Sequence, residues 1–168
     1  MQWFARFIVA GALVVALLLF MRVSEAPHST HHQTDPQLLS ALQRQRALYI
    51  QLMGMFRQDA PLFSINPQFM DPEHAVDEGR WQQYQQLFSL LSLDGGMRGW
   101  GQGGIMFIRS ILPVAEGNSK GYVYHPQNPL PIYADLDKAA AQIPINTVAY
   151  RKIDDDWYKK PLNSETSY

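Results

Sequence analysis

The feature that most constrains this chain is an uninterrupted apolar run near its N-terminus, residues 7–21, which read FIVAGALVVALLLFM. The Leu, Ile, Phe and Val residues of this run favour membrane insertion by about 3 to 6 kcal/mol in total. Arg6 and Arg22 bracket the run, about 24 Å apart along a helix, and both can extend their charged groups to the interfaces of the membrane. The pattern predicts a single transmembrane anchor over residues 1–26. The apolar residues assigned to this anchor include Phe7, Leu13, Leu17 and Phe20.

A cleaved secretory signal is the alternative interpretation, with the cut after Ser24-Glu25-Ala26. Pro27 would follow that cut, and a proline there disfavours signal peptidase, so an uncleaved anchor is preferred. Both interpretations export the rest of the chain. Arg6 and the free amino group outweigh Arg22, which Glu25 partly offsets, so we expect the N-terminus in the cytoplasm. The expected location is the bacterial inner membrane, with the C-terminal domain in the periplasm and the inverted orientation as the alternative.

The remainder of the 168 residues fits one domain. A net charge of −1 provides no basic surface for nucleic acid, and the absence of cysteine excludes disulfides, thiol catalysis and cysteine-ligated zinc. Residues 27–35 are polar and are predicted to form a linker. The exported domain is expected over residues 36–160, followed by a frayed tail over residues 161–168.

Two amphipathic helices are expected at the start of the exported domain. Asp35-Pro36 supplies an N-cap and a proline at the first helical position, and an apolar stripe follows from Leu38 to Phe56. This helix should end before Pro61. Asp71-Pro72 repeats the start signal, and a second helix is expected to run to about Leu93. Its apolar face comprises Trp81, Tyr84, Leu87, Phe88 and Leu91.

Beyond residue 104 the apolar pattern changes to a period of two, which indicates strands. Four segments are predicted to pair as two hairpins: 105–112 with 120–125, and 147–153 with 157–160. Residues 135–142 are expected to form a short helix, whereas residues 60–70 and 126–131 are expected to be irregular or extended because of their prolines. The predicted fold class is therefore α+β, with two helices and a small antiparallel sheet of three to five strands.

A glycine-rich stretch, residues 94–104, reads DGGMRGWGQGG and contains the pattern G-x-G-x-x-G. A dinucleotide-binding loop needs a strand before it and a helix after it, and here the order is reversed, so no nucleotide is expected. We expect instead a joint between the second helix and the sheet, where glycine permits the turn. A second interpretation makes this stretch part of a ligand or partner surface. The residues assigned to that surface are Arg98, Trp100, Gly101, Tyr122 and Tyr124.

The two tyrosines project from one face of their strand, and their preferred interpretation is core packing, with an exposed aromatic face as the alternative. No zincin, nucleophile-elbow or EF-hand pattern occurs, so neither a metal nor another cofactor is expected. His125 and Asp135 are a conceivable acid–base pair, although Asp135 is more simply a helix cap. The predicted function is a non-enzymatic, single-pass membrane protein whose exported domain binds another envelope protein. The alternative is a small-ligand- or glycan-binding module that uses the glycine-rich loop and the tyrosine-rich strands.

Overall fold

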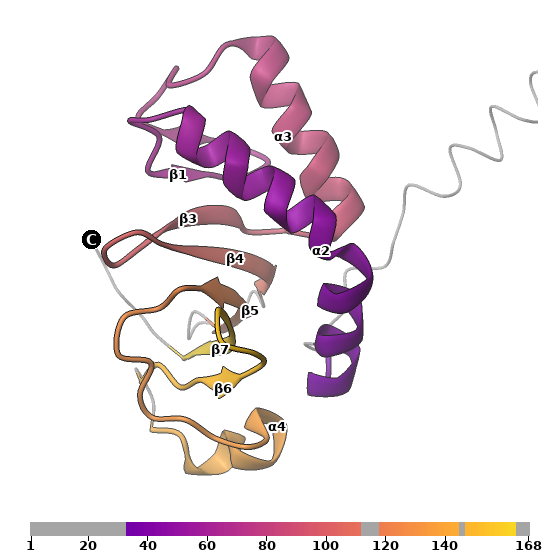
Figure 1. The fold of residues 1–168 in the computed structure, drawn as a ribbon, viewed down its shortest axis with the longest axis vertical. Helices are drawn as coiled ribbons and strands as arrows, with labels where there is room; N and C mark the ends of the chain where they lie inside the picture. The colour runs from indigo at the N-terminus through magenta and orange to yellow at the C-terminus, as the bar shows by residue number, and fades with distance from the viewer. Residues whose placement is uncertain (1–32, 112–117, 145–146, 164–168) are drawn as a thin grey trace, which may run out of the picture. The chain divides into compact units, whose positions relative to one another are not determined.

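A computed structural model describes residues 33–111, 118–144 and 147–163. Helices α2 and α3 lie on one side of a twisted antiparallel sheet, and the short helix α4 lies at the far end of the domain (Figure 1). The predicted anchor over residues 1–26 falls outside the described residues. Within the described ranges, no helix combines the length and the apolar character needed to cross a membrane.

Helix α2 spans Asp35–Gln58 and ends before Pro61, as the sequence predicts. Its N-cap is Thr34, whose extended backbone donates an N–H hydrogen bond to Gln37 Oε1 at 2.9 Å. The prediction of Asp35 as the cap is therefore wrong by one position. The physical reason is that the Asp35 carboxylate is used elsewhere, in contacts with residues far along the chain.

Helix α3 spans Glu78–Leu91, and its N-cap Asp77 accepts a hydrogen bond from the backbone N–H of Arg80 at 2.7 Å. The predicted start at Asp71-Pro72 is wrong, because Met70 and Asp71 pair with another strand and so belong to the sheet. The predicted apolar face is confirmed: Trp81 is partly buried, and the other members of the face are buried in the core.

The sheet has seven antiparallel strands in the order β2-β1-β3-β4-β5-β7-β6. The strands are β1 (Ser64–Ile65), β2 (Met70–Asp71), β3 (Gly96–Trp100), β4 (Gly104–Ile111), β5 (Asn118–Tyr124), β6 (Arg151–Lys152) and β7 (Trp157–Asn163). Both predicted hairpins are confirmed, as the pairs β4–β5 and β6–β7. The sheet exceeds the expected three to five strands because β1 and β2 arise in the segment expected to be irregular, and β3 arises in the glycine-rich stretch.

The glycine-rich stretch forms a strand and a tight hairpin turn, which corrects its interpretation as a joint or loop. Strand β3 pairs with both β1 and β4, and Gly101 and Gly103 adopt positive φ in the turn that follows. At Gly96, which has φ of 67°, a Cβ atom would lie 2.1 Å from the Ile65 carbonyl oxygen. Glycine is required there because strand β1 passes directly over the backbone.

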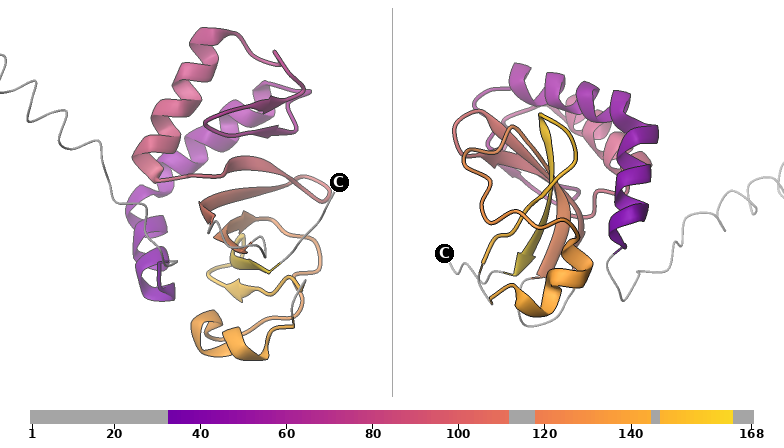
Figure 2. Two further views of the ribbon diagram at one scale, coloured as in Figure 1. Left: turned by 180° about the vertical axis from the view of Figure 1, so that it is seen from behind. Right: turned by 60° about the horizontal axis from the view of Figure 1, so that its bottom comes forward.

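The main core lies between the helices and one face of the sheet, and Tyr49 of α2 is at its centre. The Tyr49 ring makes edge contacts with Phe107, Tyr122 and Trp157 at centroid distances of 5.1, 5.4 and 5.8 Å. Figure 2 shows helix α2 crossing this face of the sheet, with helix α3 next to α2. These contacts join the helix layer to strands β4, β5 and β7.

Two smaller clusters of buried apolar residues lie outside the main core, one on the opposite face of the sheet and one around helix α4. Met106, Val123 and Tyr150 are buried on the face away from α2. Helix α4 (Leu136–Ala139) continues into the 3₁₀-helix η1 (Ala140–Gln142), which confirms the predicted short helix, and Asp135 caps it as expected.

Candidate functional site

A cleft of about 500 Å³ opens between the first half of α2 and strand β4. Its lining comprises Gln33, Pro36, Gln37, Ser40, Ala41, Arg44, Gln45 and Arg109. Two guanidinium groups, three amides and a hydroxyl face the cleft, and no aspartate or glutamate occurs among these lining residues. The cleft therefore presents positive charge and hydrogen-bonding groups to whatever enters it.

Arg109 lies at a β-bulge of strand β4. Ile108 pairs with Gly121 and Ser110 pairs with Lys120, so that Arg109 is the extra residue between two regular pairs. A bulge of this kind re-aims a side chain and is common beside functional sites. The Arg109 side chain lies beneath α2 and is only 7% exposed.

Several buried polar atoms around Arg109 make no hydrogen bond of normal geometry in the part of the chain that the structure describes. They are Nε and Nη1 of Arg109, Oε1 of Gln45 and Oη of Tyr49. The Gln45 side chain is held in place by its Nε2, which donates to the carbonyl oxygen of Leu90 at 3.0 Å. Burying a charge is unfavourable unless it is paired, and no carboxylate lines the cleft beside this arginine.

Two buried tyrosines lie close to the Arg109 guanidinium. Burial raises the pKa of Tyr49, and both the positive charge of Arg109 and a side-chain hydrogen bond with it oppose this shift. Burial also raises the pKa of Tyr122, again opposed by Arg109, and Tyr122 Oη donates to the Leu38 carbonyl oxygen at 2.6 Å. Both phenols are therefore neutral hydroxyls at ordinary pH, and neither compensates the arginine charge.

A second group of charged side chains ties the start of α2 to the C-terminal part of the domain. Asp35 and Lys159 are both fully buried and form an ion pair. Asp35 Oδ2 also accepts hydrogen bonds from Leu136 N at 3.0 Å and Arg151 Nη1 at 2.9 Å, while Asp137 Oδ2 accepts from Asp35 N at 2.6 Å. Burial lowers the pKa of Lys159, and the adjacent Asp35 carboxylate favours its charged form.

Carboxylate oxygens of three residues in this network lie within 4.8 Å of one another: Asp35, Asp135 and Asp137. Three cations contact this set: Lys120, Arg151 and Lys159. Asp135 additionally accepts the backbone N–H groups at the start of α4. Because the negative charges are already matched by positive ones, we assign a structural role to this network.

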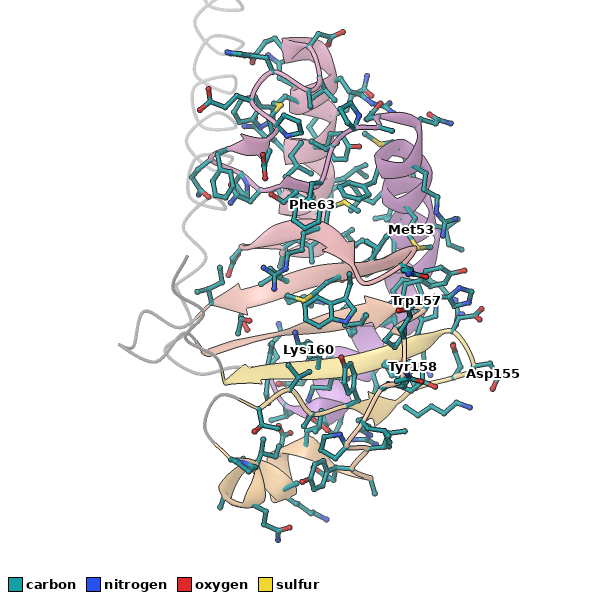
Figure 3. The ribbon with its side chains drawn as sticks, turned by 90° about the vertical axis from the view of Figure 1, so that its left-hand side faces the viewer. Met53, Phe63, Asp155, Trp157, Tyr158 and Lys160 are labelled. Atoms are coloured by element: carbon teal, nitrogen blue, oxygen red, sulfur yellow. The ribbon has the colours of Figure 1, made fainter. Side chains whose placement is uncertain are left out.

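The glycine-rich stretch places Arg98 and Trp100 on the sheet face opposite α2. Lys160 Nζ lies 3.4 Å from the centroid of the Trp100 ring, and Arg98 Cζ lies 5.5 Å from it. Lys160 comes from the same strand as Trp157 (Figure 3). Burial, together with the charge of Arg98, lowers the pKa of Lys160 to about 6.

The structure does not bring the five residues of the expected ligand surface together. Tyr122 and Tyr124 face the helices, where Tyr122 is fully buried and Tyr124 stacks on His125 at 4.3 Å. This location confirms the interpretation of the two tyrosines as core packing. Trp100 lies on the other face, and Gly101 lies in the hairpin turn between β3 and β4.

His125 and Asp135 do not form an acid–base pair in the structure, because each has another partner. His125 Nε2 lies 2.7 Å from Asp156 Oδ1. Asp135 accepts the backbone N–H groups of Asp137 and Lys138 as the cap of α4.

The cleft residues were not recognised from the sequence. One signal for Arg109 exists in the strand pattern: Ile105, Phe107 and Arg109 have the same parity, so a charge falls where an inward-facing apolar residue is expected. Arg44 carries no comparable signal, because an arginine on the polar side of an amphipathic helix is ordinary.

Comparison of the chain with protein-family models, with curated proteins and with solved structures gave no match. The geometry of the cleft is therefore the basis on which a function can be assigned.

Proposed function

We propose that this protein is a non-enzymatic, single-pass protein of the bacterial inner membrane whose periplasmic α+β domain binds another envelope protein. The observation that carries the binding role is the cleft between α2 and β4. Within the described domain, Arg109 Nε and Nη1 and Gln45 Oε1 make no hydrogen bond of normal geometry. Groups of this kind gain free energy when a bound partner satisfies them. The apolar run near the N-terminus supports the membrane location.

The hydrogen bonds in the cleft favour binding over catalysis. Ser40 carries the only hydroxyl among the described lining residues, and its Oγ is contacted by Arg44 Nη1. An activated serine needs a neighbouring base to accept its proton, whereas an arginine in a protein is always protonated and cannot do so. Elsewhere, the histidine of the considered acid–base pair is held by Asp156 on the exposed surface.

The positive charge of the cleft indicates that the partner carries acidic groups. Arg44 is exposed at the surface of α2, and Arg109 lies beneath it. Complementary charge across an interface speeds association and selects against wrong partners. An acidic segment of another envelope protein therefore fits this site.

A small ligand is the second candidate, and the volume of the cleft is the observation that favours it. About 500 Å³ falls within the range of roughly 300–1,000 Å³ that is typical of small-molecule sites. A glycan site built from Trp100 and the tyrosines has less support, because these aromatic residues lie on opposite faces of the sheet.

Site-specific photo-cross-linking in native membranes tests the proposal. A photoreactive amino acid replaces Gln37, which is exposed and lines the cleft, in the full-length protein. We expect one discrete cross-linked protein, identified by mass spectrometry. The control replaces Gln82, an exposed residue of α3 outside the cleft lining. The absence of a product at Gln37, or identical products at both positions, would contradict the proposal.

A further inference from the structure

We propose that the cleft binds a small oxyanion, a carboxylate or a phosphate, between Arg109 on its inner side and Arg44 at its surface. The inference deepens the proposed function and rests on it in one respect, namely that this cleft is the binding site. It names the chemical group that the site receives.

Arg109 is the main observation. Its side chain is more than nine-tenths buried, and its guanidinium interacts with the neutral hydroxyls of Tyr49 and Tyr122. Its Nε and Nη1 make no hydrogen bond of normal geometry among the described residues. A buried structural arginine normally donates to backbone carbonyls or pairs with a carboxylate. An oxyanion supplies hydrogen-bond acceptors for the guanidinium N–H groups together with a negative charge. The planar guanidinium can donate two parallel hydrogen bonds to such a group.

The residues that line the cleft around Arg109 supply no negative charge. The lining residues from α2 contribute amides, a hydroxyl and a second guanidinium, that of Arg44. The two nearest phenols, Tyr49 and Tyr122, stay neutral because burial raises the pKa of each. A bound oxyanion would therefore be the counter-ion of the arginine.

Gln45 adds a feature that refines the ligand class. Its Nε2 donates to the Leu90 carbonyl oxygen, so its buried Oε1 is left as an acceptor in the cleft that Arg109 also lines. An acceptor at this place suits a ligand that carries a hydroxyl group next to its anionic group. Citrate and glycerol 3-phosphate both have this combination and provide one probe for each oxyanion.

Isothermal titration of both probes into the full-length protein, purified in a mild non-ionic detergent at about 0.15 M salt, tests the inference. We expect the wild type to bind at least one probe, and the probe that binds identifies the oxyanion. Arg109→Met should weaken binding about tenfold or more, because a charge-assisted hydrogen bond is lost. Arg44→Gln should weaken it several-fold.

Two controls separate a binding role from a structural one. Arg57→Gln makes the same charge change on the exposed last turn of α2, away from the cleft, and should leave affinity unchanged. Arg109→Met should unfold at the same or a higher denaturant concentration than the wild type without ligand, since methionine needs no counter-ion. A marked loss of stability in Arg109→Met would indicate a structural arginine and would count against the inference.

Failure of the inference can be distinguished from failure of the proposed function. If neither probe binds the wild type, or if Arg57→Gln weakens binding as much as Arg44→Gln, the oxyanion site is refuted even when cross-linking finds a protein partner. If a probe binds through Arg109 and no partner is cross-linked, the oxyanion site stands and the protein-binding function is refuted.

Discussion

At the scale of single residues, two neighbouring lysines of β7 show how one backbone step changes the chemistry of a side chain. Lys159 pairs across the sheet with Tyr122 and faces the helices, where it meets the Asp35 carboxylate. Lys160 points to the other face, where it contacts the Trp100 ring and lies 3.7 Å from the sulfur of Met106. Both positions hold a lysine, so the face of the sheet to which each side chain points decides which lysine gains a counter-ion.

The Lys160 environment predicts a specific dependence of stability on pH. In the unfolded chain a lysine holds its proton up to about pH 10.4, whereas burial lowers the pKa of Lys160 to about 6 in the folded protein. Between these values the unfolded state binds more protons, so the free energy of unfolding rises with pH. We expect Lys160→Met to be more stable than the wild type at neutral pH. Its free energy of unfolding should also increase less steeply with pH than that of the wild type.

Chemical denaturation at several pH values between about 6 and 9 measures the effect. Lys138→Met, at an exposed position of α4, is the control and should keep the slope of the wild type. An unchanged slope in Lys160→Met would show that the lysine stays protonated beneath Trp100.

At the scale of elements, local periodicity was enough to predict the two hairpins, the apolar face of α3 and the short helix α4. Strands β1 and β2 have two residues each and depend on pairing with each other and with β3, which no local pattern records. The start of α3 was misplaced for the same reason, because Asp71 is held by strand pairing. The cleft was missed because it joins one face of α2 to strand β4, and the packing of a helix against a distant strand leaves no local pattern in the sequence.

The ion pair between α2 and β7 predicts a large effect on stability. Asp35→Asn leaves Lys159 buried without its main counter-ion and should reduce the free energy of unfolding by about 3–5 kcal/mol. The double variant Asp35→Leu/Lys159→Met removes both charges and should recover much of that loss. Urea denaturation followed by circular dichroism measures both variants.

An exposed ion pair of β6 provides the matched control. Lys152 and Asp155 are 3.0 Å apart, with side chains 50% and 98% exposed, so Lys152→Gln should change stability little. If Asp35→Asn proves as mild as Lys152→Gln, the buried network does not hold α2 in place.

At the scale of the whole molecule, the expected anchor determines which compartment the cleft faces. Paired fusions after Tyr168 measure this directly, one with alkaline phosphatase, which is active only outside the cytoplasm, and one with a fluorescent protein that matures only inside. We expect phosphatase activity in the membrane fraction, because the apolar run and its flanking charges predict an N-terminus in the cytoplasm. Fluorescence in place of phosphatase activity would show the inverted orientation and would make cytoplasmic metabolites the candidate ligands.

The position of β7 in the sheet also has a consequence for how the chain acquires its fold during synthesis. Strand β7 lies between β5 and β6, and it supplies both the Trp157 ring beneath Tyr49 and the lysine that pairs with Asp35. Helix α2 therefore emerges from the ribosome long before the strand that completes its contacts. Until β7 is delivered, β5 is an unpaired edge, and such edges invite aggregation or capture by chaperones. A chain that stalls before residue 157 would thus be recognisable to quality control as unfinished, although most of its secondary structure has already been made.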